Sequence, residues 1–273
     1  MLVVQISDTH LVGAGLLKGR VDTAANLEAV LGLVQGAPSV PDLLVLSGDL
    51  VHDGSTAAYE HLRLLVEPVS SHLGCPVLYV PGNHDVRATF RSVLLGGAPS
   101  AGPIDQVLTV KGWRVLALDS VVEGHDHGEL DEGQLGWLAD QLSEPAERGS
   151  VVVLHHPPIP SPIELMSRIS LRRPGELAGV ILSTDVVAVL CGHYHHATAG
   201  MLASVPVFVA PATAYQADVL VGSGVFLGFP GCAFSRVELG DDGSASATVV
   251  MVPLAEADLS PFGAVSTADL GLD

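Results

Sequence analysis

Short apolar runs recur along this chain, and each is followed closely by a polar motif. They cover residues 2–6, 43–46, 77–80, 115–118, 151–154 and 186–190. Runs of four to six residues rich in valine and leucine are typical of strands buried on both faces. Strands of this kind need other layers above and below them, so the chain must build a largely buried central sheet.

Segments with helical spacing lie between several of these runs, at residues 23–34, 56–69 and 130–142. The alternation of strand and helix predicts an α/β fold. Residues 205–209, 233–239 and 245–252 are also strand-like, but few helical segments separate them, and residues 240–243 have the composition of a hairpin turn. We therefore predict that the last third forms a second, more antiparallel sheet.

The length of 273 residues predicts one domain with two packed sheets. Hydrophobic residues make up 48% of the chain and charged residues 15%, which is enough apolar material for a sizeable core. We place this domain at residues 1–255. Residues 256–273 are small and acidic, and they are predicted to be a loosely ordered tail.

The net charge of −18 argues against a nucleic-acid polymer as substrate or partner, because so acidic a surface repels a phosphate backbone. An anionic small substrate would need local positive charge, which bound metal ions can supply. The apolar runs are far shorter than the ~20 residues that span a bilayer, so no membrane association is expected. Three scattered cysteines and the absence of a leader-like N-terminus predict a cytoplasmic protein.

Five polar motifs carry the chemistry of this sequence. Each follows an apolar run, and the carboxyl ends of strands are where open α/β sheets gather their sites. In a strand-end loop, residues i and i+2 point the same way and can reach one ion. The motifs are Asp8-Thr9-His10, Gly48-Asp49, Gly82-Asn83-His84-Asp85, His155-His156-Pro157-Pro158 and Gly192-His193-Tyr194-His195.

Taken singly, each motif also fits a turn or a buried structural histidine. Their order and completeness change this interpretation, because all of them offer oxygen or nitrogen ligands after a predicted strand. Mixed nitrogen and oxygen donors favour Fe, Mn or Zn over Ca or Mg. The sequence therefore predicts a metal site at the ends of the strands.

These motifs resemble those of the calcineurin-like metallophosphoesterases, and the match covers residues 8–195. The sequences around Asp8, around His155 and at residues 127–130 are similar to those of the bacterial class III cyclic-nucleotide phosphodiesterases. The resemblance implies a four-layer α/β/β/α sandwich of two mixed sheets. It also implies two transition-metal ions per chain, with iron in the first site and Mn, Fe or Zn in the second.

By the same resemblance, one ion would be held by Asp8, His10, Asp49 and His195. The other would be held by Asp49, Asn83, His155 and His193. Asp49 would then bridge the two ions, and a carboxylate suits this role because it has two oxygens to share.

The resemblance also implies catalytic roles. His84 would contact a phosphate oxygen and assist the leaving alkoxide, while Asp85 either orients the His84 imidazole or simply caps a turn. Asn83, His84 and His195 would contact the substrate. His156 is expected to be structural, and His125, Asp126 and His127 form either a substrate loop or a solvated one.

The expected activity is hydrolysis of a 3′,5′-cyclic nucleotide such as cAMP to the 5′-monophosphate, with room for promiscuity. An alternative is another esterase of the same superfamily, acting on glycerophosphodiesters or nucleotide-linked substrates. A second is a metal-binding scaffold without catalysis, which completeness of the ligand set disfavours. A homodimer stays open, since residues 219–229 could be core or a dimer surface.

Overall fold

The protein is built around two stacked mixed sheets, described here from a computed structural model that covers residues 1–222, 224–253 and 262–266. The first sheet has five strands in the order β13-β12-β1-β2-β3, and the second has six in the order β4-β5-β6-β7-β9-β8. A small third sheet has the order β10-β11-β14. The strands are β1 (Leu2–Ile6), β2 (Leu43–Ser47), β3 (Val77–Val80), β4 (Gln106–Val110), β5 (Trp113–Leu118), β6 (Gly149–Leu154), β7 (Val186–Cys191), β8 (Thr198–Leu202), β9 (Val205–Val209), β10 (Gln216–Ala217), β11 (Val225–Phe229), β12 (Cys232–Leu239), β13 (Ala245–Val252) and β14 (Phe262–Ser266).

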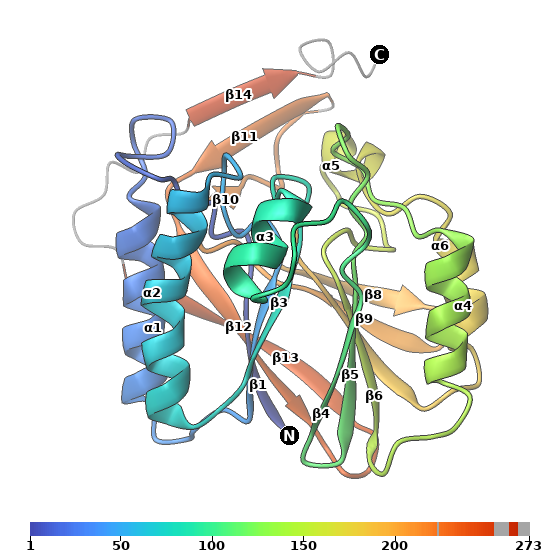
Figure 1. Ribbon diagram of the computed structural model, residues 1–273. Helices are drawn as coiled ribbons and strands as arrows, with labels where there is room; N and C mark the ends of the chain where they lie inside the picture. Colours follow the sequence, from blue (N-terminus) through green and yellow to red (C-terminus); the bar gives the residue numbers. More distant parts are fainter. Residues whose placement is uncertain (223, 254–261, 267–273) are drawn as a thin grey trace.

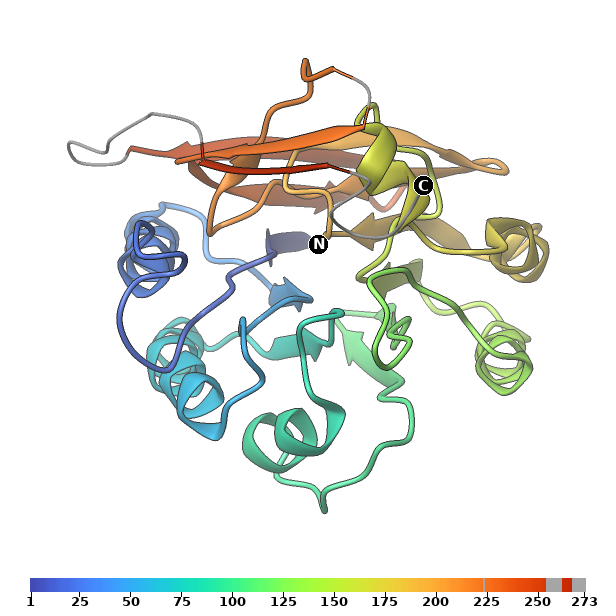
Figure 2. The ribbon, with the colours of Figure 1, turned by 90° about the horizontal axis from the view of Figure 1, so that it is seen from above.

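Helices cover the outer face of each large sheet, so the molecule has four layers in the order α/β/β/α (Figures 1 and 2). Buried side chains such as Val45 of β2 and Val153 of β6 form the core between the sheets. The helices are α1 (Thr23–Gly36), α2 (Thr56–Leu73), α3 (Arg87–Leu94), α4 (Glu132–Gln141), α5 (Glu164–Arg168) and α6 (Pro174–Ile181). The predicted fold class is confirmed.

The parallel strands run from the centre to one edge of the first sheet and occupy the middle of the second. β1, β2 and β3 run parallel to one another, and so do β5, β6, β7 and β9. Their valine- and leucine-rich sequences are buried on both faces, as in β2, where all five residues are buried. Because parallel strands end at the same edge, the loops after β1, β2, β3, β6 and β7 can meet.

Local signals explain where the longer helices begin and end. Asp22 caps α1 by accepting a hydrogen bond from Ala25 N, and Ser55 caps α2 by accepting one from Ala58 N. At the other end of α2, Gly74 has a left-handed backbone, which glycine adopts without strain. These helices bury the apolar stripe that the sequence predicts and pack it against the first sheet.

The predicted partners of the C-terminal strands were wrong. β9 joins the six-stranded sheet in parallel beside β7. β12 extends the first sheet antiparallel to β1, and β13 pairs antiparallel with β12. The second sheet is therefore made mainly by the middle of the chain. The hydrophobic pattern of a strand records which faces are buried but carries no information on the neighbouring strand. The predicted hairpin at residues 240–243 does connect β12 to β13.

Most of the predicted tail, at residues 256–261 and 267–273, lies outside the described residues, and β14 within it pairs with β11. The stretch predicted as core or dimer surface is divided: Leu220 is 90% exposed, whereas Phe226 is 8% exposed. Among the described residues, no helix is both long and apolar enough to cross a membrane.

Candidate metal centre

The five motifs meet at one edge of the sandwich. Asp8, Asp49 and Asn83 follow β1, β2 and β3 of the first sheet, whereas His155 and His193 follow β6 and β7 of the second. The centre therefore lies where loops from both large sheets converge.

One group of donors surrounds His10. Its Nε2 atom lies 3.0 Å from His195 Nε2 and 3.5 Å from Asp49 Oδ2. His195 Nε2 in turn lies 3.5 Å from Asp8 Oδ1. Asp8, His10 and His195 place their ligand atoms within 4.8 Å of one another and are all buried, an arrangement that can hold a metal ion.

A second group surrounds His155. Its Nε2 atom lies 3.4 Å from Asp49 Oδ1, and its ring centroid lies 5.0 Å from that of His193. Asp8, Asp49 and His155 form another set of ligand atoms within 4.8 Å of one another. The Asp49 carboxylate thus contacts the first group through Oδ2 and the second through Oδ1.

Two buried polar atoms near this centre lack a hydrogen-bond partner among the described residues: Asn83 Oδ1 and His155 Nε2. Leaving one buried acceptor without a hydrogen bond lowers the stability of the fold by about 1–3 kcal/mol. Two such atoms close together are therefore unusual in a well-packed region. Amide oxygen and imidazole nitrogen are both ligands for divalent transition metals. The donor set therefore fits bound cations.

Backbone carbonyls determine which ring nitrogen each histidine presents. His155 Nδ1 donates to Ser47 O at 2.9 Å, and His195 Nδ1 donates to Tyr215 O at 3.0 Å. His193 is turned the other way, because its Nε2 donates to Ile169 O at 3.0 Å. In their neutral forms, His155 and His195 present the Nε2 lone pair to the centre, and His193 retains Nδ1.

The backbone of the centre lies in an uncommon region. Asp8, His10, Asp49, His193 and His195 all have positive φ angles, between 42° and 74°. Non-glycine residues rarely adopt such angles, and those that do cluster at functional sites because surrounding structure must impose the strain. Half of the ten non-glycine residues with positive φ in the described part of the chain belong to this one centre.

Glycines allow the loops to approach this closely. Gly48 has a φ of +98°, and a Cβ atom there would lie 2.2 Å from His155 Nδ1. At Gly192 a Cβ atom would lie 1.9 Å from Ser7 Oγ. No side chain fits at either position, so both motifs require glycine for contact between loops of different sheets.

Burial and mutual contact set the charges of the centre. Burial alone would raise the pKa of Asp49, but the neighbouring histidines, His155 first, bring it well below its ordinary value. Burial would lower the pKa of His155, yet Asp49 raises it to about 9. Burial keeps the pKa of His10 and of His193 well below the usual range. These two rings are therefore neutral, as a metal ligand must be.

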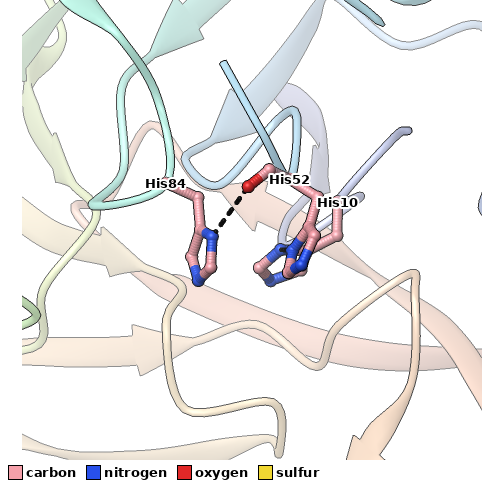
Figure 3. Close-up of side chains that lie close together, drawn as sticks. All are labelled: His10, His52 and His84. Carbon is pink, nitrogen blue, oxygen red and sulfur yellow. Dashed lines mark hydrogen bonds between the residues drawn. The ribbon is translucent and has the colours of Figure 1, made fainter. Parts of the chain in front are cut away.

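His84 stands beside the centre and is held by a backbone group rather than by Asp85. Its Nδ1 donates to His52 O at 3.0 Å, and its ring stacks on that of His52 with centroids 4.8 Å apart (Figure 3). The His84 ring also lies edge-on to His10 at 4.8 Å. Within the described part of the chain no hydrogen bond engages His84 Nε2, so this atom can act on a ligand.

Asp85 is held as a loop cap. Its carboxylate accepts hydrogen bonds from the backbone N–H groups of Leu50, Val51 and Gly82 and from Tyr59 Oη. The structure does not bring this carboxylate to the His84 imidazole, so of the two predicted roles the turn cap is the one that its hydrogen bonds support. Asp85 joins the loop after β2 to the loop after β3 and so holds Asn83 and His84 in place.

The remaining histidines differ in their hydrogen-bond partners and in their exposure to solvent. His156 Nε2 donates to Asp126 O at 3.1 Å, so its Nδ1 accepts from Ser120 Oγ at 2.8 Å. Both ring nitrogens are satisfied, which fits the predicted structural role. His127 contacts Glu129 at 3.5 Å, and His125 is exposed.

A cavity of about 270 Å³ opens onto the centre. Its lining combines polar side chains of the centre with apolar ones from α5 and β11 and with Tyr215. A second hollow of about 210 Å³ shares Asn83 and His84 with the first. The first cavity is lined by His10, Asn83, His84, Asp126, Leu165, Met166, Ile169, His193, His195, Tyr215 and Phe226.

Sequence reasoning missed His52 and the carbonyl groups that orient the rings. His52 lies three residues after Asp49 on a turn and belongs to none of the five motifs. Its position after a motif loop was the available signal. The sequence gives no signal for the carbonyls of Ser47, Ile169 and Tyr215, because every residue type has the same backbone carbonyl group.

Two stacked mixed sheets that gather buried Asp and His side chains and a half-buried Asn at one edge define the metallophosphoesterase class. This chain belongs to the calcineurin-like phosphoesterase family, whose sequence profile matches residues 1–197. Membership implies divalent metal ions, with which the clusters of Asp and His are compatible.

Three relatives illustrate the range of the family. The chain is 44% identical to the cAMP/cGMP dual specificity phosphodiesterase MT0825 of Mycobacterium tuberculosis, over 82% of this chain and 70% of the relative. It is 38% identical to the 3′,5′-cyclic adenosine monophosphate phosphodiesterase CpdA of Escherichia coli K12, over 71% of this chain and 69% of the relative. It is 32% identical to the glycerophosphodiester phosphodiesterase GpdQ of Enterobacter lignolyticus, over 79% and 78%.

Solved structures share the fold at low sequence identity. A dimetal phosphatase from Danio rerio superposes with a TM-score of 0.61 at 12% identity, covering 93% of this chain and 99% of the other. Purple acid phosphatase PPD1 from yellow lupin has a TM-score of 0.67 at 12% identity, covering 97% and 53%. At this identity the likeness concerns the fold alone.

Proposed function

We propose that this protein is a metal-dependent phosphodiesterase that hydrolyses 3′,5′-cyclic nucleotides to 5′-monophosphates. The observation that carries the proposal is the Asp49 carboxylate, which contacts one set of buried donors through each oxygen. The names of the relatives at 44% and 38% identity support the cyclic-nucleotide substrate.

Two transition-metal ions would occupy the centre. Asp8, His10, Asp49 and His195 would hold one, and Asp49, Asn83, His155 and His193 would hold the other. The unpaired Asn83 Oδ1 and His155 Nε2 support this assignment. The mixed donor set favours Fe, Mn or Zn over Ca or Mg, and the resemblance to the family implies iron in the first site and Mn, Fe or Zn in the second.

When bound, the ions would neutralise the phosphodiester charge and activate water for attack on phosphorus. The chain supplies the remaining parts. Asn83 and His84 would contact the phosphate oxygens. The two ring nitrogens of His195 are both engaged, Nε2 with the ion and Nδ1 with Tyr215 O, so neither is left for the substrate contact predicted for this residue. His84 protonated on both ring nitrogens gives its Nε2 proton to the departing 3′ oxygen. The His84 ring is fixed for this task by its hydrogen bond to His52 O. Asp85 positions the loop that carries Asn83 and His84.

The cavity suits a substrate with one anionic end and one flat apolar end. Leu165, Met166 and Phe226 supply apolar lining beside the polar donors, and a nucleobase has the aromatic faces to pack against them. An apolar wall discriminates weakly between bases, so we expect cAMP and cGMP to be hydrolysed at similar rates.

The decisive experiment compares three proteins on a substrate panel. Wild type, Asn83→Ala and His84→Ala are purified with Mn²⁺ and assayed on cAMP, cGMP, 2′,3′-cyclic AMP, glycerophosphocholine and bis(p-nitrophenyl) phosphate. Loss of Asn83 should lower metal content and all rates. Loss of His84 should leave metal content unchanged and lower kcat by about 10²–10⁴ on the substrates with a poor leaving group.

Intact rates and metal content in Asn83→Ala would refute the assignment of the centre. If glycerophosphocholine were hydrolysed faster than either cyclic nucleotide, the alternative of a glycerophosphodiesterase would be favoured. The relative at 32% identity, a glycerophosphodiester phosphodiesterase, is the reason for including this substrate. A wild-type protein that binds ions but hydrolyses none of the five substrates would instead indicate a scaffold.

We also infer a cytoplasmic location. The cysteines Cys75, Cys191 and Cys232 are all buried free thiols, which suits a reducing compartment.

A further inference from the structure

His52 contacts two rings of the centre, those of His10 and His84, which also contact each other. Its Nδ1 atom lies 3.4 Å from His10 Nδ1, and its ring is inclined at 62° to that of His10. It also stacks on His84 with an interplanar angle of 21° (Figure 3). His52 is half-buried and contacts both this ligand candidate and the ring beside the proposed substrate site.

The positions of the protons decide which residue donates in the contact between His10 Nδ1 and His52 Nδ1, and this step rests on the proposed function. If His10 gives its Nε2 lone pair to a cation, its proton must reside on Nδ1. His10 Nδ1–H then donates to His52 Nδ1, and His52 carries its own proton on Nε2.

We propose that His52 is a positioning residue with two separable actions. It accepts the hydrogen bond of His10 Nδ1–H, which fixes the tautomer and angle of that ligand, and it braces the His84 ring by stacking. A metal-binding histidine ordinarily donates its second N–H to a carboxylate, a carbonyl or water. Here the acceptor is a neutral imidazole, which withdraws the proton less strongly than a carboxylate.

A third cation offers another explanation for the cluster, since His10, His52 and His84 have ligand atoms within 4.8 Å of one another. The hydrogen bonds speak against it. His84 Nδ1 donates to a carbonyl, and His10 Nε2 faces Asp49 and His195. The three rings therefore cannot all direct free lone pairs to one point between them.

Substitutions can separate the two actions. Asn at position 52 retains an acceptor where Nδ1 lies but loses the stacking ring. Phe retains the ring but has no acceptor, and Ala removes both. The backbone carbonyl that holds His84 is preserved in all three variants. His72→Ala, which removes an exposed histidine near the end of α2, serves as the matched control.

The experiment measures how fast Mn²⁺-loaded protein loses metal to excess chelator, together with kcat and KM for cAMP. Removing the partner of a metal-binding histidine commonly weakens metal affinity 10- to 100-fold. We expect His52→Ala and His52→Phe to lose one of two metal equivalents at least tenfold faster than wild type. His52→Asn should retain both equivalents nearly as wild type does.

For kcat, the variant expected to behave like wild type is His52→Phe rather than His52→Asn. At saturating Mn²⁺, His52→Phe should keep kcat for cAMP within about twofold of wild type, because the brace on His84 remains. His52→Ala and His52→Asn should lower kcat several-fold with little change in KM. This crossed pattern distinguishes positioning from a general structural defect, which would lower both readouts in every variant.

Three outcomes would overturn the inference. One is metal loss and kcat in His52→Ala that match those of His72→Ala. Another is a failure of both rescues, and the third is a wild-type protein with three metal equivalents of which His52→Ala keeps two. The proposed function is tested separately, because it fails only if wild type itself binds no metal or hydrolyses no phosphodiester.

Discussion

At the scale of single residues, the centre is held by contacts that tolerate almost no added volume. Gly192 begins the motif that carries His193 and His195, and its missing side chain lets Ser7 and Asp8 approach from the other sheet. The chemistry of the ligands therefore depends on a residue that offers no ligand.

Gly192→Ala should be destabilising by about 1–3 kcal/mol, because the new methyl group would lie 1.9 Å from Ser7 Oγ and 2.9 Å from Ser47 O. Chemical denaturation measures this, and metal content should fall with it. Gly32→Ala is the control: no atom lies within 4 Å of that position on α1, and alanine there should stabilise by up to about 1 kcal/mol. Equal stability of the two variants would contradict the close packing.

Asp85 makes stability depend on pH in the metal-free protein. Burial raises its pKa from the ordinary 3.8 to about 6. A carboxyl group with a raised pKa stabilises the fold fully below its unfolded pKa, and this contribution is lost as the pH rises through about 6. Asp85→Asn lacks this titration, so its stability relative to wild type should rise by about 3 kcal/mol between pH 4 and 7.

Urea denaturation at both pH values tests this expectation, with Asp53→Asn as an exposed control. Tyr59 Oη also donates to the Asp85 carboxylate, so Tyr59→Phe should raise the pKa of Asp85 further and move the transition to higher pH. A pH-independent difference between wild type and Asp85→Asn would show that the carboxyl group is ionised throughout.

Single residues were the most predictable part of the site. Asp8, Asp49 and His155 follow recognisable strands, so their convergence could be inferred from the ends of parallel strands. The orientation of each ring could not, because carbonyls such as Tyr215 O come from distant segments of the chain. The partners of Asp85 were missed for the same reason.

At the scale of elements, prediction succeeded where a segment carries its own signal. α1 and α2 have long apolar stripes and capping residues, and β2 is apolar throughout. α3 was missed because only Phe90 and Leu94 are buried in its eight residues. The partners of β9 and β12 depend on long-range contacts, which a local pattern does not encode.

The capping box of α4 makes a prediction about one element. Asp131 accepts from Gln134 N at 2.8 Å, and Gln134 Oε1 accepts from Asp131 N at 3.2 Å. Asp131→Ala should lower the free energy of unfolding by about 1 kcal/mol. Asp140→Ala, at the exposed end of the same helix, should cost nothing or stabilise slightly, since a negative charge there opposes the helix dipole. Equal losses in both variants would argue against the cap.

At the scale of the whole molecule, the candidate ligands divide between the two sheets. Asp8, His10, Asp49 and Asn83 follow strands of the first, and the histidines after β6 and β7 follow strands of the second. Bound cations should therefore connect the two halves of the sandwich.

Removal of the ions should lower the melting temperature, because a ligand that binds only the folded state adds about 4 kcal/mol at a thousandfold excess over its dissociation constant. Differential scanning calorimetry with and without chelator measures the shift. Asp49→Ala removes the shared carboxylate, so its melting temperature should not respond to chelator. A shift of the same size in Asp49→Ala would place the stabilising ions elsewhere.

The division of ligands between residues 8–83 and 155–195 also has a consequence for how the activity could arise and be lost. Each of the two proposed ion sites takes donors from both halves of the polypeptide, so we expect a nascent or nicked chain to be inactive until both halves have docked. Two separately produced fragments, cut in the exposed segment near Pro99, would recover ion binding only upon reassociation, which makes the metal an indicator of correct assembly.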